Sequence, residues 1–157
     1  MSGYQATTPQ RPTRPAHAWR GTLYWCLIPA IIVLPLLLLV TRQGWGFLFA
    51  LYALPVIVIV EVAILVAVRS RAKALGTQQV GPLTCWPLLL HYIGSVILPF
   101  CIGDATDQGN VPAPLQIFSI PEPVVEVIAT VTGALAIQGG LVALILAIVE
   151  AVQARRR

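Results

Sequence analysis

Four long apolar runs constrain the fold of this chain more than any other feature. They occupy residues 23–40, 45–68, 83–102 and 124–149, and they contain 18, 24, 20 and 26 residues. A helix needs about 20 apolar residues to cross the ~30 Å hydrocarbon core of a bilayer, so each run is long enough to span a membrane. Charged residues make up only 10% of the chain, whereas soluble domains contain roughly 25%. The sequence therefore predicts an all-α, four-span transmembrane helix bundle.

Positive charge is confined almost entirely to one set of connecting segments. Of the 10 Lys and Arg residues, nine lie before the first run, between the second and third, or after the fourth. Lys and Arg in short loops remain in the cytoplasm, so we expect both termini to be cytoplasmic, with Arg42 as the exception. Nine arginines against one lysine indicate a bacterial protein and hence the cytoplasmic (inner) membrane. Because these residues flank the spans, lipid headgroups explain them, and no nucleic-acid partner is expected.

Two regions are expected along the chain. Residues 1–19 are rich in Pro, Thr, Gln and Arg, a composition that cannot bury enough apolar surface to fold. We predict that they form a disordered cytoplasmic tail, and that residues 20–157 form the transmembrane domain. The four-residue turn at 41–44 requires the first two helices to be antiparallel neighbours, whereas residues 69–82 form a longer inner loop.

The connection at residues 103–123 differs from the others because it is acidic and rich in proline. We expect a long outer loop without regular structure, a kind of segment that is often functional. Within it, residues 115–120 alternate apolar and polar side chains and could lie in the outer headgroup region or cover the helix ends. Asp104, Asp107 and Asn110 offer too few oxygen ligands for a hard cation. Neither a metal site nor a cofactor is predicted.

Small residues recur along the fourth run with a heptad period, which places them on one stripe of a helix. The members of this small-residue seam are Ala129, Gly133, Ala136, Gly140, Ala143 and Ala147. Such a stripe lets helix backbones approach closely, and it could face another helix of the same chain or a second protein. The stripe continues to Glu126 and Glu150, about 36 Å apart. We expect these carboxylates near the two headgroup regions, with Glu150 close to Arg69 or Arg71.

Three polar residues lie inside the spans. Glu61, His91 and Gln138 are expected about 10, 12 and 16 Å from the inner ends of their runs, so they could form one cluster. An ionisable residue in a span costs roughly 2.5–3.5 kcal/mol and usually faces the protein interior or a water path. Glu61 and His91 could exchange a proton near neutral pH, or they could form a structural bond between helices.

Motifs for catalysis are absent from the sequence. It contains no HExxH, no phosphate-binding glycine loop and no GxSxG, so we do not expect an enzyme, although an outer-loop carboxylate leaves that reading open. The leading hypothesis is a non-enzymatic accessory, assembly or self-associating subunit, whose partners are the lipid bilayer, other membrane subunits or a second copy. The competing hypothesis is a small proton- or ion-coupled transporter or channel that uses Glu61 and His91.

Overall fold

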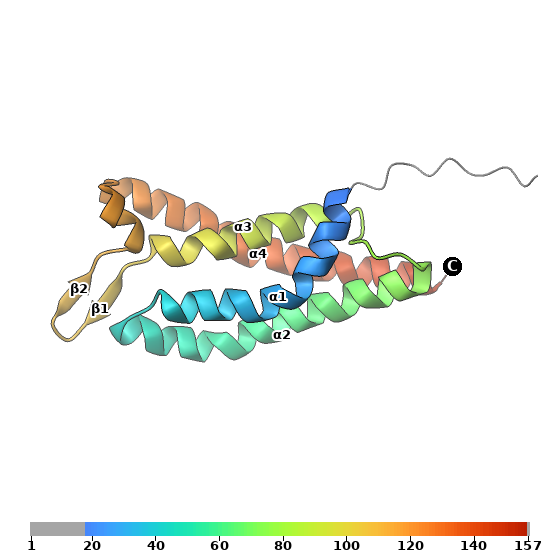
Figure 1. Ribbon diagram of the computed structural model, residues 1–157, viewed down its shortest axis with the longest axis horizontal. Coiled ribbons are helices and arrows are strands. Elements are labelled where there is room, and N and C mark those ends of the chain that lie inside the picture. The colour runs from blue at the N-terminus through green and yellow to red at the C-terminus, as the bar shows by residue number, and fades with distance from the viewer. Residues whose placement is uncertain (1–17, 157) are drawn as a thin grey trace, which may run out of the picture.

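The computed structural model describes residues 18–156 and has four helices that form one elongated bundle (Figure 1). The prediction of an all-α fold is confirmed. In chain order the elements are α1 (Ala18–Val40), α2 (Gly44–Leu75), α3 (Cys85–Cys101), β1 (Asp104–Thr106), β2 (Gly109–Val111), the 3₁₀ helix η1 (Pro114–Phe118) and α4 (Glu122–Arg155). Most of the predicted tail lies outside the described residues. Its last two positions, Ala18 and Trp19, are instead the first residues of α1.

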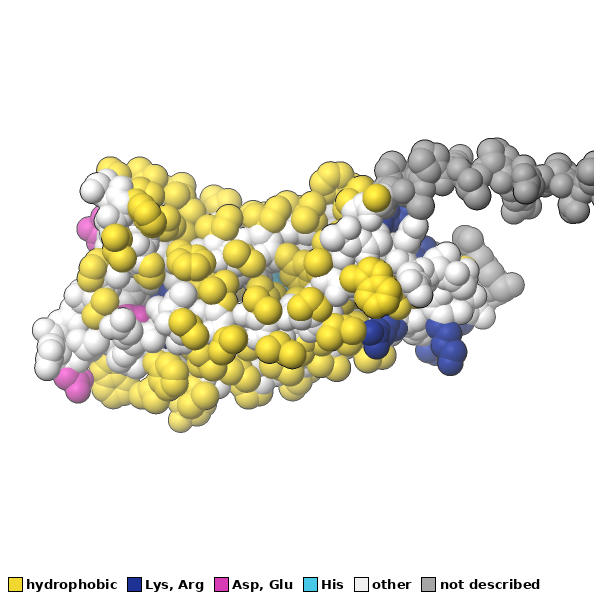
Figure 2. Space-filling view, viewed as in Figure 1, with side chains coloured by type: hydrophobic (Ala, Val, Ile, Leu, Met, Phe, Trp, Pro, Cys, Tyr) yellow, Lys and Arg dark blue, Asp and Glu magenta, His cyan; other side chains and the backbone are white. Residues whose placement is uncertain are grey.

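Three of the helices, α1, α2 and α4, are long and apolar enough to cross a membrane, with 23, 32 and 34 residues. The apolar helix α3 is shorter, with 17 residues, or about 25 Å. Large hydrophobic side chains cover the outside of the bundle between its two ends (Figure 2). Such a surface is unfavourable in water but suits lipid. The chain is therefore a helical membrane protein.

The two ends of the bundle differ in charge. Lys and Arg side chains gather where α1 begins and α4 ends, and acidic side chains gather at the opposite end (Figure 2). We call the first the basic end, defined by Arg20, Arg71 and Arg155. The other is the hairpin end, because β1 and β2 lie there (Figure 1).

At the basic end, α2 continues past its apolar run, so the predicted inner loop at 69–82 was wrong in its bounds. Arg69, Arg71 and Lys73 all lie in the helix, because long straight side chains are good helix formers. The helix ends at Gly76, which has φ 62° and donates its N–H to the carbonyl of Ala72, a common helix stop. The connection to α3 is therefore only residues 76–84.

At the hairpin end, the loop predicted to lack regular structure contains an antiparallel hairpin and η1. Asp104 pairs with Val111, and Thr106 pairs with Gly109. After the hairpin, Leu115 and Ile120 pack on a small core at the ends of α3 and α4, made by Cys101, Ala113 and Val125. The neighbouring Ile117 and Phe118 are 82% and 76% exposed, so the stretch covers the helix ends with one side only.

The small-residue seam of α4 faces the interior of the same chain. At Gly94 of α3, an added Cβ would lie 2.6 Å from the backbone nitrogen of Ala136 and 2.6 Å from the carbonyl oxygen of Thr132. This contact is closer than any side chain allows, so the two backbones touch here. The seam residues Ala136, Gly140, Ala143 and Ala147 are buried, and Ala129 and Gly133 are half-buried. The seam therefore packs α4 against α3, and the second-protein alternative is not needed to cover it.

Candidate functional site

Glu61 and His91 form a buried pair that joins α2 to α3. Nε2 of His91 lies 2.6 Å from Oε1 of Glu61. Glu61 is only 1% exposed, and His91 is 8% exposed. Two of the three polar residues predicted at similar depth are thus in direct contact.

The contact of the second imidazole nitrogen, Nδ1, shows that this atom is protonated. Nδ1 of His91 lies 2.6 Å from the carbonyl oxygen of Ala136 on α4. A carbonyl oxygen can only accept a hydrogen bond, so Nδ1 carries a proton. Nε2 then either accepts a hydrogen bond from a protonated Glu61 or donates one to the ionised carboxylate. In both forms the pair is neutral overall, and the two forms differ by the position of one proton.

The seam provides the space that His91 occupies. An added Cβ on Gly140 would lie 2.8 Å from Nδ1 of His91 and 3.0 Å from its Cε1. Ala136, one helical turn before Gly140, supplies the carbonyl that holds the ring. Small residues that the sequence marked only as a packing stripe therefore also position the imidazole.

A cavity of about 310 Å³ adjoins the pair and is lined by residues of all four helices. Its walls are apolar apart from Glu61, His91 and Ser95, and it extends to Pro99 near the hairpin end. From His91 to Pro99 is eight residues, or about 12 Å along α3. The volume lies at the small end of the range for ligand pockets, which are mostly apolar with a few polar groups.

The pair leaves one polar atom without a partner. Oε2 of Glu61 is buried and makes no hydrogen bond within the described part of the chain. Leaving a buried acceptor unpaired costs about 1–3 kcal/mol, and more for a charged group. An additional hydrogen-bond donor or cation beside Oε2 would relieve that cost.

Gln138 does not join the pair, so the cluster of three that similar depth allowed does not form. Its side chain is exposed, and no hydrogen bond links it to Glu61 or His91 within residues 18–156. The reason is helical geometry, since positions two apart point to nearly opposite faces of a helix. Ala136 and Gly140 face α3, and Gln138 between them faces outward.

Arg42 is a buried residue that the sequence marked only as an exception to the charge pattern. Its guanidinium donates to the carbonyl oxygens of Pro99 and Ile102, the latter at 3.0 Å, and lies 3.7 Å from a carboxylate oxygen of Asp104. The Arg42 and Asp104 side chains are 4% and 6% exposed. These carbonyls lie at the end of α3, where backbone acceptors lack partners within the helix. In the sequence, the only sign of this contact was the position of Arg42 as the exception to the charge pattern.

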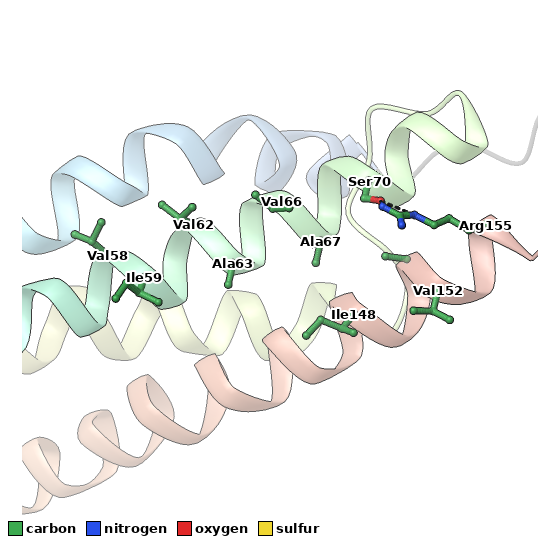
Figure 3. A pocket seen from close by; sticks show the side chains of 11 residues that line it. Val58, Ile59, Val62, Ala63, Val66, Ala67, Ser70, Ile148, Val152 and Arg155 are labelled. Atoms are coloured by element: carbon green, nitrogen blue, oxygen red, sulfur yellow. Dashed lines mark hydrogen bonds between the residues drawn. The ribbon is translucent and has the colours of Figure 1, made fainter.

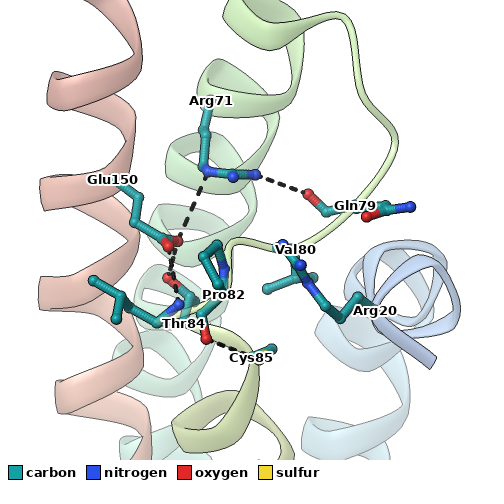
Figure 4. Close-up of polar contacts among 9 residues, drawn as sticks. Arg20, Arg71, Gln79, Val80, Pro82, Thr84, Cys85 and Glu150 are labelled. Atoms are coloured by element: carbon teal, nitrogen blue, oxygen red, sulfur yellow. Dashed lines mark hydrogen bonds and ion pairs between the residues drawn. The ribbon is translucent and has the colours of Figure 1, made fainter. Parts of the chain in front are cut away.

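Glu150 occupies the opposite end of α3 (Figure 4). Its carboxylate accepts hydrogen bonds from the N–H of Leu83 at 3.0 Å and the hydroxyl of Thr84 at 2.8 Å. Nε of Arg71 lies 3.9 Å away, so the expected contact with Arg71 is present. The helix dipole interacts favourably with a negative group at the start of a helix and with a positive group at its end. Glu150 and Arg42 therefore hold α3 at its two ends.

Arg20 ties α1 to the loop before α3 (Figure 4). Its guanidinium donates to the carbonyl of Val80 at 2.9 and 2.6 Å, and the N–H of Val80 returns a hydrogen bond to the Arg20 carbonyl. Arg20 and Arg71, which donates to the carbonyl of Gln79, therefore have a structural role at this end. They hold the short connection against the helices.

The metal-ligating side chains and the cysteines of the described residues form neither a cluster of three ligands nor a disulfide. No group of three His, Cys, Asp or Glu side chains there could hold a metal ion. Asp104 and Asp107 of the outer loop accept hydrogen bonds from the N–H of Gln43 and the indole of Trp45. Cys26, Cys85 and Cys101 are free thiols.

Comparison with known proteins gives no relative from which a role could be transferred. No family model, no curated protein and no solved structure matches this chain. The function must therefore be argued from the Glu61–His91 pair and its surroundings.

Proposed function

We propose that this chain is a four-span protein of the bacterial cytoplasmic membrane with both termini in the cytoplasm. The separation of charge between the basic end and the hairpin end supports this topology, because Lys and Arg favour the cytoplasmic side. Arg42, the one basic residue at the hairpin end among residues 18–156, is buried against Asp104 and the end of α3. In this topology α3 is the third span, with its ends held by Glu150 and Arg42.

We propose further that the protein is a small proton transporter or channel in which Glu61 and His91 exchange the transported proton. The observation that carries the proposal is the unpartnered Oε2 of Glu61 beside an apolar cavity. When a cation or hydrogen-bond donor approaches Oε2, it favours the carboxylate, and the proton on Oε1 moves to Nε2 of His91. Charged residues buried in spans commonly mark such proton pathways.

The accessory-subunit hypothesis has less support than the transporter. One of its supporting features was the small-residue seam of α4, and in this chain α3 covers that surface. Affinity purification in mild detergent separates the two hypotheses, since an accessory subunit brings a larger complex with it. A transporter is active as the purified chain.

The test is proton flux into liposomes that contain the purified protein and a pH-sensitive dye. A potassium diffusion potential set by valinomycin drives protons inward, and we expect the wild type to acidify the lumen. Glu61→Gln keeps the shape and hydrogen bonding of the side chain but cannot ionise, so flux should fall at least tenfold. Gln138→Leu, a change at an exposed site on α4, should leave it unchanged. Equal flux for wild type and Glu61→Gln at equal folded fraction would leave the pair with a structural role only.

A further inference from the structure

A groove lies between α2 and α4 on the outside of the bundle, toward the basic end (Figure 3). Its volume is about 640 Å³, and it is separate from the cavity beside Glu61. Ile59 and Val66 of α2 and Ile148 and Val152 of α4 contribute to its apolar walls, with alanines between them (Figure 3). In a bilayer this groove faces lipid.

One end of the groove is polar. Arg155 donates from Nε and Nη2 to the hydroxyl oxygen of Ser70, at 3.1 and 2.7 Å (Figure 3). Among residues 18–156, no carboxylate lies within ion-pair distance of Arg155. Glu150, on the same helix, is instead held by Leu83 and Thr84 at the start of α3. Within the described part of the chain, the positive charge of the guanidinium is therefore uncompensated, and it has N–H groups free to donate.

The length of the groove matches half of a bilayer. The residues of α2 that line the groove run from Val58 to Ser70, a separation of 12 residues or about 18 Å along the helix, and one leaflet of a ~30 Å hydrocarbon core is about 15 Å deep. An acyl chain lying along the apolar walls would thus place its headgroup at the level of Ser70 and Arg155.

We propose that this groove is a binding site for one anionic phospholipid, with its phosphate at Arg155 and an acyl chain between α2 and α4. Arginine is well suited to phosphate because its planar N–H groups bind two oxygens at once. A second copy of the chain fits less well. Copies in one membrane share an orientation, so a symmetric contact through this groove would bring the uncompensated Arg155 and the exposed Arg156 of both copies to the same end. The proposal does not depend on proton transport.

The test compares phosphatidylglycerol with phosphatidylcholine of the same acyl chains, added to the delipidated full chain in neutral detergent. Thermal unfolding and native mass spectrometry report binding. We expect phosphatidylglycerol to raise the unfolding temperature and to remain bound as one molecule per chain, with at least fivefold preference over phosphatidylcholine. Arg155→Gln should remove the preference, and Arg155→Lys should retain part of it. Arg156→Gln is the matched control, because this residue is adjacent and exposed but does not line the groove.

Each other outcome overturns the proposal. Equal effects of the two lipids would mean that the groove binds any acyl chain regardless of the charge of the headgroup. Equal loss in Arg155→Gln and Arg156→Gln would mean a diffuse attraction of the basic end rather than a site. A dimer by native mass spectrometry that is abolished by Ala63→Leu in the groove wall, with no lipid retained, would assign the groove to a second copy.

Discussion

Glu61 and Glu150 are both carboxylates buried in the bundle, 1% and 6% exposed, yet their surroundings differ. Both oxygens of Glu150 have hydrogen-bond partners, and Arg71 is close by. One oxygen of Glu61 is hydrogen-bonded to His91. Its other oxygen lies beside a cavity and has no hydrogen-bond partner among the described residues. A buried carboxylate with every acceptor satisfied favours stability, whereas one with an open acceptor is suited to binding or proton exchange. Three substitutions test this difference between the two carboxylates.

The largest effect is expected from Glu150→Ala, which should lower the free energy of unfolding by about 3 kcal/mol. The N–H of Leu83 and the hydroxyl of Thr84 would lose their acceptor, and Arg71 would lose its counter-charge. Thermal unfolding in detergent measures the change. Glu126→Ala is the control at the far end of the same helix, where the side chain is exposed, and it should change the stability by less than about 0.5 kcal/mol. Similar losses for both variants would contradict a specific role for Glu150.

A smaller effect, about 1–3 kcal/mol, is expected from Gly140→Ala. The new methyl group would overlap the His91 ring, so the imidazole must move away from Glu61 and Ala136. Histidine ¹⁵N chemical shifts report the altered ring environment, and thermal unfolding reports the stability. Gly133→Ala is the matched control, because its Cβ would meet only Leu98, at an ordinary 3.6 Å. Unchanged His91 shifts in Gly140→Ala would show that the ring does not need this glycine.

The smallest change in stability, under about 1 kcal/mol, is expected from Glu61→Gln. The amide N–H₂ can donate to Nε2 of His91 while Nδ1 keeps its bond to Ala136, so no polar group loses a partner that it had. Glu61→Leu should cost more, about 1–3 kcal/mol, because Nε2 is then left unsatisfied. Thermal unfolding of both variants in parallel makes the comparison. If Glu61→Gln were as destabilising as Glu61→Leu, ionisation of Glu61 would be part of what holds the bundle together.

Much of the helical architecture could be predicted because hydrophobicity and residue size are local properties. The apolar runs marked the helices, and the short turn at 41–44 matched the connection Thr41–Gln43 between α1 and α2. The depth estimate brought Glu61 and His91 together correctly. It failed for Gln138, because depth takes no account of the direction in which a side chain points around the helix.

The hairpin and the caps of α3 were harder to predict because their stabilising partners are distant in sequence. Arg42 meets carbonyls 57 and 60 residues away, and Glu150 meets groups 66 and 67 residues away. The same holds for Asp104, whose contact with the N–H of Gln43 helps to seat the hairpin on the start of α2. The charge pattern marked Arg42 as an exception, but no local pattern identifies the distant groups that these residues meet.

A helical membrane protein with small residues along one face of α4 follows from the amino-acid order, because apolar length and side-chain size act independently of the rest of the fold. The packing of the helices, by contrast, sets which partner that face meets and which polar groups are satisfied. The close contact of α3 with α4 buries the seam, holds His91 by the Ala136 carbonyl and leaves Oε2 of Glu61 open. Those outcomes depend on how helices are rotated against one another, and rotation is set by packing among residues far apart in the chain.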